Sequence, residues 1–479
     1  MVRGSPRRGK PSSKSAESPT PDQEVEHLRQ RVAELELENE ELRREKSQLE
    51  DKIKAISREA FRQAAPFRRR DRLRSKAPKK PGRRPGHPGA RRPEPKQVDE
   101  KVEAPLSRCP HCGGRVTDVR PIKQTVEDIP AVRPMVTEIV TYRGTCSDCG
   151  PVRSTHPRQV SMASGAAGAQ VGPRATALAT DLNKRLGIPA AKTCAVLKEH
   201  FSLKLTPGGL VHLQARLARR LTPTYEELAV LIRKSPVAHA DETSWWVGGP
   251  GYWLWVFTNL KFTLYRVEKS RGRDVVETVL GDPYEGVLVS DCLSAYERLS
   301  CRQQKCYAHH FKAIARAAED HPNSSFLAEA QMLLKSALAL HSLRDRVPEH
   351  EYIGLVSRLE GWADRLLDPA TPADHLKIAK RLRKRRRHLF TFLRHRGVDA
   401  TNNAAERALR PAVIARKISC GNRTERGKQT WQVLASIAAT CSQQQRSFTK
   451  LVEKALPVGA PIPSLKCRPE RPRAPTNAR

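Results

Sequence analysis

The sequence predicts a multidomain α/β protein. The chain has 479 residues, which at roughly 100 to 200 residues per domain corresponds to three or four modules. Its pattern changes along its length, from a heptad-spaced helix to paired Cys-x-x-Cys units, and then to short apolar strands and helices after residue 230. Strands and helices within one segment are typical of an α/β core. The largest buried core is therefore expected in the C-terminal half.

The chain is strongly basic. Lys and Arg total 87 against 51 Asp and Glu, which gives a formal net charge of +36. Such a charge favours a polyanion, because binding to nucleic acid releases condensed counterions, and an anionic membrane is the competing partner. The sequence contains no run of 18 or more apolar residues and no apolar signal core after its basic N-terminus. We therefore expect a soluble, cytoplasmic protein without a membrane partner.

The N-terminal residues predict self-association. Residues 1–20 are rich in Ser, Pro, Lys and Arg and are expected to be disordered. Residues 21–58 predict a coiled coil, because apolar residues recur at intervals of three and four with charges between them. Asn39 falls at an a-like position, where a polar residue can specify register and a dimer. The alternative is one long solvated helix packed on its own domain.

Residues 59–100 predict a basic, Pro- and Gly-rich linker. Twelve Lys or Arg residues, Arg83 and Arg84 among them, lie between residues 66 and 93. Repeated Pro and Gly prevent a helix, but an extended basic arm can follow a phosphate backbone or enter a minor groove. A DNA-binding arm and a plain solvated linker explain this composition about equally well. At the other end of the chain, residues 446–479 are interpreted as a basic tail.

Two cysteine pairs predict a zinc ribbon within residues 101–160. Each pair stands on a Cys-x-x-Cys-Gly turn that can direct both thiolates toward one ion, and the pairs are Cys109 with Cys112 and Cys146 with Cys149. Residues 122–126 and 136–142 between them are strand-like. Four thiolates make a closed, structural Zn²⁺ site. A redox role is the weaker alternative, because neither pair lies in a βαβ context.

Residues 165–225 predict three helices, over 173–186, 189–200 and 207–220. Thr206 can cap the last helix and Pro207 suits its first turn. The short link before this helix suggests a helix-turn-helix, in which Val211, His212, Gln214 and Arg216 would face a DNA groove. Simple packing of three short helices is nearly as consistent with the pattern.

Residues 230–445 predict a ribonuclease H-like catalytic core. The expected order is three strands (237–241, 252–258 and 262–267), a helix (273–280) and a fourth strand (286–291). Asp241 and Asp291 stand where the first and fourth strands run out, so that their carboxylates are held rigidly yet stay open to ions. A third acid, Glu406, follows Asn402 and Asn403, either of which can cap its helix, and Arg410 lies one turn further on.

Three such carboxylates suit phosphoryl transfer. Displacement at phosphorus places charge on both the attacking and the leaving oxygen, and two Mg²⁺ or Mn²⁺ ions held by hard oxygen ligands stabilise both. The competing interpretation is that a chain with many acids places three after short strands by chance. A capped Glu beside an Arg is also often only a surface ion pair.

Four blocks carry a family resemblance: HADETSWW, VSDCLSAY, CYAHHFKAIAR and NNAAERALRP. Together with the order of the preceding modules, they resemble the DDE transposases of insertion-sequence family sixty-six (TnpC-type), over roughly residues 25 to 445. The resemblance implies that Asp241, Asp291 and Glu406 are the catalytic, metal-binding acids. It also implies a helical insertion over 312–400 and a DNA substrate made of the element's terminal inverted repeats and a target.

The insertion ends in a basic run over residues 380–387, where Arg383, Arg385 and Arg386 suit contact with DNA phosphates and a solvated face is the alternative. Cys306 and His309 also match a family feature, but two residues do not complete a zinc site, so a structural or supporting role is expected. The residues after Asp291 and after Arg416 depart from the family pattern.

The resemblance further implies a homodimer or higher oligomer near the nucleoid and companion proteins encoded by the same element. Two other functions remain open: a DNA-binding protein on a degenerate nuclease-like scaffold, and a nuclease that cuts without joining. The heptads and the separate basic segments favour an assembly that pairs two DNA ends, which transposition requires.

Overall fold

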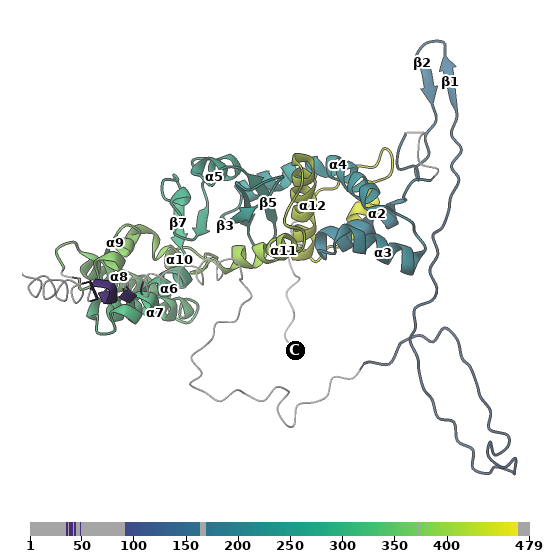
Figure 1. Ribbon diagram of the computed structural model, residues 1–479, viewed down its shortest axis with the longest axis horizontal. Helices are drawn as coiled ribbons and strands as arrows, with labels where there is room; N and C mark the ends of the chain where they lie inside the picture. The colour runs from purple at the N-terminus through teal and green to yellow at the C-terminus, as the bar shows by residue number, and fades with distance from the viewer. Residues whose placement is uncertain are drawn as a thin grey trace, which may run out of the picture. The chain divides into compact units, whose positions relative to one another are not determined.

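The computed structural model describes residues 92–162, 169–371 and 373–467, together with scattered residues between 35 and 48 (Figure 1). The chain divides into two units, Met1–Ile122 and Lys123–Arg479, and each is treated by itself. Of the predicted coiled coil, the described residues are helical and exposed, and Asn39 donates its side-chain N–H to the carbonyl of Leu35. Residues 1–20 and most of the basic linker, including Arg83 and Arg84, lie outside the described part of the chain.

Both Cys-x-x-Cys pairs lie in tight turns. In the first unit of the chain, the N–H of Gly113 donates to the carbonyl of Cys109 at 2.8 Å. In the second unit of the chain, the pair Cys146 and Cys149 lies at the turn of a hairpin between β1 (Arg143–Cys146) and β2 (Gly150–Arg153).

The strands predicted for residues 122–126 and 136–142 were wrong. Both segments are irregular, and Ile122 and Val136 are largely exposed. Alternating apolar residues form a strand only where another strand pairs with them and a core buries one face, and neither condition is met here.

Three helices precede the sheet, as predicted. They are α2 (Pro173–Thr180, continued to Arg185 by a π-helical turn), α3 (Ala190–Phe201) and α4 (Pro207–Arg233). Thr206 caps α4 through the N–H of Gly209. The expected end at residue 220 was wrong, because α4 continues through Pro223 while burying Leu221, Leu228 and Ile232.

Gln214 was expected to face a DNA groove. Its side chain is instead buried, with 1% of the residue exposed, and α4 packs against α12. Gln214 therefore cannot contact DNA while α4 keeps this packing. The helix-turn-helix interpretation of the segment stays a prediction.

A mixed five-stranded sheet forms the centre of the second unit (Figure 1). Its strands are β3 (Val237–Trp245), β4 (Tyr252–Thr258), β5 (Thr263–Glu268), β6 (Val287–Ser290) and β7 (Arg302–Lys305), in the order β5-β4-β3-β6-β7. The first three pair antiparallel, and β6 and β7 add in parallel. Helix α5 (Arg273–Leu280) connects β5 to β6. Four strands and this helix were predicted, and β7 was not.

Helices cover both faces of the sheet. On one face, Ala238, Ala240 and Leu288 join a core with residues of α4, α5 and α12. On the other face, Leu254 and Val256 pack with α11 (Asn403–Ser419). The same alternation places Val287 and Val289 against helices of the insertion.

The insertion predicted for residues 312–400 coincides with a run of helices, the first of which begins earlier, at Tyr307. It contains α6 (Tyr307–Asp320), α7 (Ser325–Ser342), α8 (Glu349–Leu367), α9 (Leu376–Arg383) and α10 (Thr391–Arg394). These helices bury a second core, which includes Leu333, Leu334 and Phe392 and also Val287 and Val289 of the sheet. In the described part of the chain, no helix is long and apolar enough to span a bilayer.

The chain ends with α12 (Glu425–Gln443) and α13 (Phe448–Ala455). Residues from 446 onward were expected to form a basic tail. Phe448, Leu451 and Val452 of α13, and Leu465 after it, are instead buried in the main core. This segment alternates apolar and basic residues, and the tail interpretation took account only of the charge.

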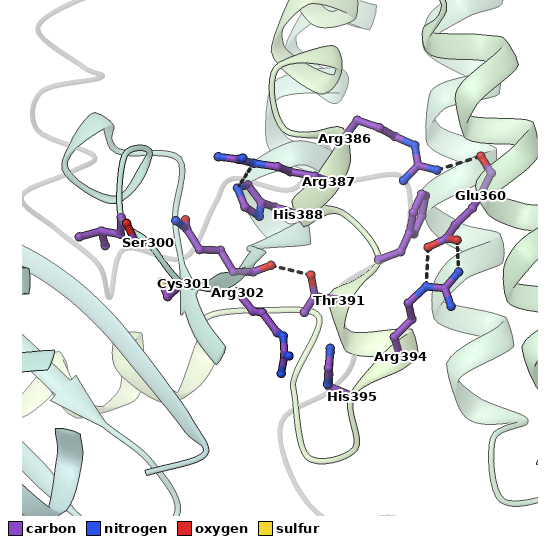
Figure 2. A pocket seen from close by; sticks show the side chains of 13 residues that line it. Ser300, Cys301, Arg302, Glu360, Arg386, Arg387, His388, Thr391, Arg394 and His395 are labelled. Atoms are coloured by element: carbon purple, nitrogen blue, oxygen red, sulfur yellow. Dashed lines mark hydrogen bonds and ion pairs between the residues drawn. The ribbon is translucent and has the colours of Figure 1, made fainter. Parts of the chain in front are cut away.

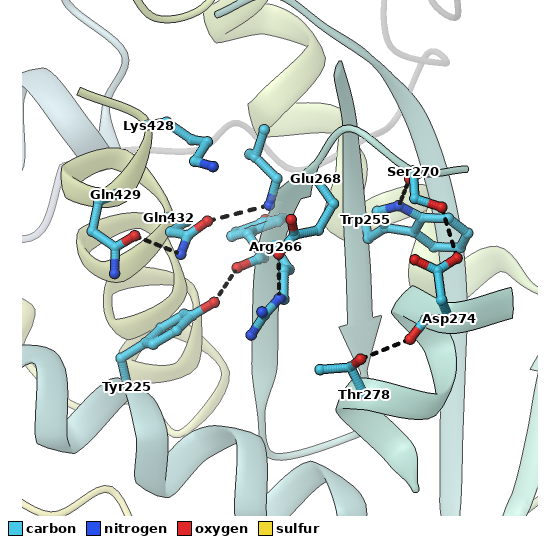
Figure 3. A network of polar contacts seen from close by, with 12 residues as sticks. Tyr225, Trp255, Arg266, Glu268, Ser270, Asp274, Thr278, Lys428, Gln429 and Gln432 are labelled. Atoms are coloured by element: carbon cyan, nitrogen blue, oxygen red, sulfur yellow. Dashed lines mark hydrogen bonds and ion pairs between the residues drawn. The ribbon is translucent and has the colours of Figure 1, made fainter. Parts of the chain in front are cut away.

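Helix α12 closes the free edge of β5. Its polar residues at four-residue spacing accept hydrogen bonds from the outward N–H groups of the strand, and Figure 3 shows the first of these residues, Gln432. These bonds join Gln432 to Val267, Ser436 to Tyr265 and Thr440 to Thr263, at 3.2, 2.8 and 3.0 Å. An uncovered edge strand is a template for pairing with another chain. The buried polar stripe of α12 removes that risk and aligns the helix with the sheet.

We expect Ser436→Ala to lower the free energy of unfolding by about 1–3 kcal/mol, because the buried N–H of Tyr265 loses its acceptor. Denaturant unfolding measures this loss. Ser442→Ala is the matched control on the same helix, since the Ser442 hydroxyl is exposed and donates only to the carbonyl of Ala438. Equal losses in the two variants would contradict the role given to α12.

Candidate metal centre

Strand register places Asp241 and Asp291 side by side. In the parallel pair, Val237 faces Val287 and His239 faces Val289, and the same offset counted two residues further relates Asp241 to Asp291. Because side chains alternate along strands, residues two positions after a facing pair lie on the same face. Asp241 shares its face with Val256 of β4, its antiparallel partner. Both carboxylates therefore lie on the face that α11 covers.

One expectation for Asp241 was wrong. This residue is inside β3, not at its end, because pairing with β4 continues to Trp245. Pairing with β6 stops at His239, and Asp291 comes directly after β6. At Asp241, β3 is therefore still paired with β4 along one edge, whereas along its other edge the pairing with β6 has already ended.

Backbone N–H groups orient both carboxylates. Oδ1 of Asp241 accepts from the N–H of Glu242 at 2.9 Å, and Oδ1 of Asp291 accepts from the N–H of Leu293 at 2.8 Å. Each acid keeps its second oxygen for another ligand. This arrangement suits cation binding, because the carboxylates are held in place before an ion arrives.

Glu406 reaches the same face from the first turn of α11. The helix packs through Ala405 and Leu409 against Leu254 and Val256 of the sheet. The start of α11 is fixed by Asn402, whose side-chain N–H donates to the carbonyl of Ala240 at 2.8 Å. Asn402 occupies the N-cap position, as expected, but its side chain makes no capping bond. It joins helix to strand instead.

The charges of Asp291 and Glu406 both act on Asp241. Burial holds the pKa of Asp241 well above its usual range, and the nearby charges of Glu242, Asp291 and Glu406 raise this pKa further. Like charges gathered in a buried site disfavour ionisation, and a bound cation removes that penalty. The donor set therefore fits a hard divalent ion, although the three acids do not lie as close together as a second group described below.

The sequence analysis missed Glu242. Its side chain is 3% exposed and binds Nη2 of Arg271 at 2.8 Å and the hydroxyl of Tyr296 at 3.1 Å. Burial raises the pKa of Glu242, and the hydrogen bond from Arg271 opposes this rise. Because Arg271 satisfies its charge, Glu242 is a poorer cation ligand than Asp241. No motif distinguished the two adjacent acids.

Lys305 was also missed. This fully buried lysine of β7 donates to Oγ of Ser290 at 3.1 Å, immediately before Asp291. Burial lowers the pKa of Lys305 to about 8, against the opposing influence of Cys292 and Asp291. A buried lysine here adds positive charge beside an otherwise acidic site. Its strand contains no apolar residue, which is why the sequence pattern did not reveal it.

Among the residues that the structure describes, one group offers three metal-ligating atoms that all lie within 4.8 Å of one another. It consists of Cys306, His309 and Glu406. Cys306 and His309, which the sequence analysis left without further metal ligands, thus lie close to Glu406.

The four-cysteine zinc ribbon stays a prediction, because Cys109 and Cys112 lie in one unit of the chain and Cys146 and Cys149 in the other. Within each pair the local chemistry favours thiolates. Backbone N–H groups of His111 and Cys112 lower the pKa of Cys109, and those of Cys149 and Asp148 lower the pKa of Cys146. Metal binding requires the thiolate form.

The basic run predicted to contact DNA makes many contacts within the protein. Arg383 donates to the carbonyls of Leu367 and Asp368, and Arg385 binds Glu297 and the carbonyl of Cys292. Arg386 binds Asp364 at 2.7 Å. Phosphate contact by these side chains would compete with these bonds, so their part in DNA binding stays a prediction.

Beside this run lies a cavity of about 600 Å³. Figure 2 shows Arg386 and Arg394 directed at Glu360 on one side of it, and Arg302 and Arg387 on the other. Arg302, Arg387 and, on α11, Arg410 are exposed. These exposed guanidinium groups are better placed to meet an anion than Arg383, Arg385 and Arg386.

A family model described as Transposase IS66 family matches residues 168–430 of the chain. The chain belongs to this family. The match contains all three acids, the insertion and Cys306 with His309. This IS66-family chain is also similar to two curated proteins of Sinorhizobium fredii (strain NBRC 101917 / NGR234), named uncharacterized protein y4qI and uncharacterized protein y4hP.

Similarity to these relatives is low but extended. With y4qI the identity is 26% over 247 residues, which cover 44% of this chain and 45% of the relative. With y4hP it is 23% over 449 residues, which cover 82% of this chain and 77% of the relative. The matched segment thus spans less than half the length of y4qI. Neither name states an activity.

We expect Mg²⁺ to raise the unfolding temperature of the full chain, and the rise to grow with pH. The pKa of Asp241 is raised in the folded state, so the metal-free fold loses stability as pH rises from the ordinary carboxyl range toward this raised pKa. Deprotonated Asp241 is the form that binds a cation. At about 100 times its dissociation constant, an ion would add about 2.7 kcal/mol.

Thermal unfolding in chelator and in Mg²⁺, across a pH series, measures this effect. Asp241→Asn should lose the Mg²⁺-dependent rise and unfold at a higher temperature than the wild type in chelator. Asp320→Asn, a change at an exposed acid of α6, should behave as the wild type. If Asp241→Asn responded to Mg²⁺ as fully as the wild type, Asp241 would not be a ligand.

Proposed function

We propose that this protein is a DNA transposase that cleaves and joins DNA strands at the ends of its element. Asp241, Asp291 and Glu406 would hold two divalent ions, Mg²⁺ or Mn²⁺, on a ribonuclease H-like sheet. The observation that carries the proposal is the convergence of these acids on one face, from two adjacent strands and a helix distant in sequence. Membership of the transposase family supports the same function.

The sheet supports the fold assignment. Three antiparallel strands are followed by two that add in parallel on the far side of the first strand. The order along the chain, three strands, a helix and a fourth strand, is the one that the sequence predicted, and β7 extends it. Acids at the end of a parallel strand pair are rigidly placed and accessible from outside the sheet.

The roles of the residues follow from their placement. When bound, the two ions would activate the attacking oxygen and stabilise the leaving oxygen. Asp241 and Asp291, oriented by backbone N–H groups, would hold them from the sheet, and Glu406 would complete the site from α11. Asn402 positions Glu406 by joining α11 to β3. Lys305 and Arg271 limit the surplus of negative charge.

DNA and the chain itself are the proposed partners. A net charge of +36 favours DNA, and the predicted coiled coil would bring two chains, and so two element ends, together. Companion proteins from the same element remain part of the proposal. The alternative of a degenerate DNA-binding scaffold is disfavoured, because such a protein has no need to keep three acids on one face.

Purified full-length protein should cleave DNA that carries the inverted repeats flanking its own gene, in Mg²⁺ or Mn²⁺, and join the resulting 3′-hydroxyl ends to a target. Asp241→Asn, Asp291→Asn and Glu406→Gln should each reduce cleavage about a hundredfold or more, since each metal ligand contributes several kcal/mol to the transition state. Asp320→Asn is the control. Mapping of breaks and joined products gives the readout.

Three outcomes distinguish the alternatives. Breaks without joined products would indicate a nuclease. Tight DNA binding without breaks, even with companion proteins supplied, would indicate a DNA-binding scaffold. Cleavage that survives all three substitutions would remove the acids from the mechanism.

Arg410→Ala should weaken DNA binding about equally for all sequences. It should also reduce the slope of log K against log salt concentration by about one, as expected for one lost phosphate contact. Arg385→Ala should mainly lower the unfolding temperature, because the Arg385 side chain is 11% exposed and bound to Glu297. Salt titrations of binding, read beside thermal unfolding, separate the two effects. An unchanged salt dependence in Arg410→Ala would exclude that contact.

A further inference from the structure

Cys306 and His309 stand together at the start of α6. Cys306 is the N-cap residue of this helix, and three residues later His309 lies in its first turn. Cys306 is fully buried, at the junction of β7 and α6. The N–H of Asn402 donates to its Sγ at 3.2 Å, so the same residue that fixes the start of α11 also contacts the thiol.

His309 has a buried ring nitrogen without a partner. Its Nδ1 makes no hydrogen bond within the part of the chain that the structure describes. Buried polar atoms are almost always satisfied, and an unsatisfied one requires an explanation such as an ion. A neutral imidazole nitrogen is a good ligand for zinc.

Glu406 supplies the third ligand. One ligand atom each from Cys306, His309 and Glu406 lies within 4.8 Å of the others. In a tetrahedral zinc site with bonds of about 2.0–2.3 Å, neighbouring ligand atoms are roughly 3.6 Å apart. Closing this group around an ion therefore requires movements of at most about an ångström between any two ligand atoms.

We propose that Cys306, His309 and Glu406 form a Zn²⁺ site that shares Glu406 with the carboxylate centre. Sulfur and imidazole ligands select zinc over Mg²⁺, which prefers oxygen ligands alone. On binding, the thiol of Cys306 releases its proton to solvent and its sulfur bonds to the ion. The fourth position is left for water. Zn²⁺ in this site withdraws Glu406 from the proposed catalytic ions and so inhibits them.

The inhibitory consequence rests on the proposed function, whereas zinc binding itself does not. The test therefore measures binding first, without DNA. Full-length wild type, Cys306→Ser and His309→Ala are loaded with Zn²⁺, passed through a desalting column and analysed for zinc per chain. Wild type should keep one equivalent more than either variant, whatever the predicted ribbon retains. Co²⁺ should give a thiolate charge-transfer band that is weaker in Cys306→Ser.

Cys301→Ser is the matched control, because Cys301 precedes β7 and is not part of the group. It should bind as much zinc as the wild type. If Cys306→Ser fails to fold, His309→Ala decides the question, since His309 is only partly buried. Equal zinc content in wild type and in a folded His309→Ala variant would overturn the proposal.

A second measurement separates this proposal from the proposed function. Zn²⁺ titrated into the Mg²⁺-dependent cleavage reaction should inhibit the wild type at concentrations that fill the extra site. If the wild type binds the extra zinc but does not cleave DNA, the zinc-site proposal is supported and the proposed transposase function is contradicted. Cleavage by a wild type that holds no extra zinc would do the reverse.

Discussion

The parallel pairing of β3 with β6 determines where the first two acids lie. Its register brings Asp241 and Asp291 to neighbouring positions on one face. A slip of one residue would turn Asp291 toward the opposite core, because side chains alternate between the faces of a sheet. The register is maintained by burial on both sides, with Ala238 and Leu288 in one core and Val287 and Val289 in the other. The acid pair therefore depends on ordinary apolar packing.

Asn402 connects this sheet to the third acid. Its side chain bonds to Ala240 in β3, and its backbone N–H bonds to Cys306 at the start of α6. The insertion begins and ends at this junction and buries the second core. That core includes Val287 and Val289 of β6, so the insertion packs against the sheet. The chain returns at a fixed point, and Glu406 reaches the face shared by the aspartates.

Charge is distributed unequally among the acids of the centre. Glu242 is neutralised by Arg271 on the opposite face of the sheet, and Lys305 lies beneath the strand end that bears Asp291. The pKa of Asp241, by contrast, is raised by burial and by the neighbouring acids. Glu406 is a candidate ligand in both proposed metal sites. In one it would join the carboxylate oxygens of the aspartates, and in the other the sulfur of Cys306 and the ring nitrogen of His309. Whether Glu406 binds Mg²⁺ or Zn²⁺ would then depend on which of these two groups of ligands it joins.

The sequence by itself determined the strands β3 to β6, the helical insertion and the three candidate acids. Apolar alternation and helix-forming runs are local properties, and Asp241, Asp291 and Glu406 stand in recognisable blocks. Local patterns could not reveal β7, whose four residues are polar but buried, or the passage of α4 through Pro223. They also could not show that α13 completes the core. Only the tertiary structure decided that Glu406 meets Cys306 and His309 while its charge also raises the pKa of Asp241, because that proximity arises from packing between segments far apart in the chain.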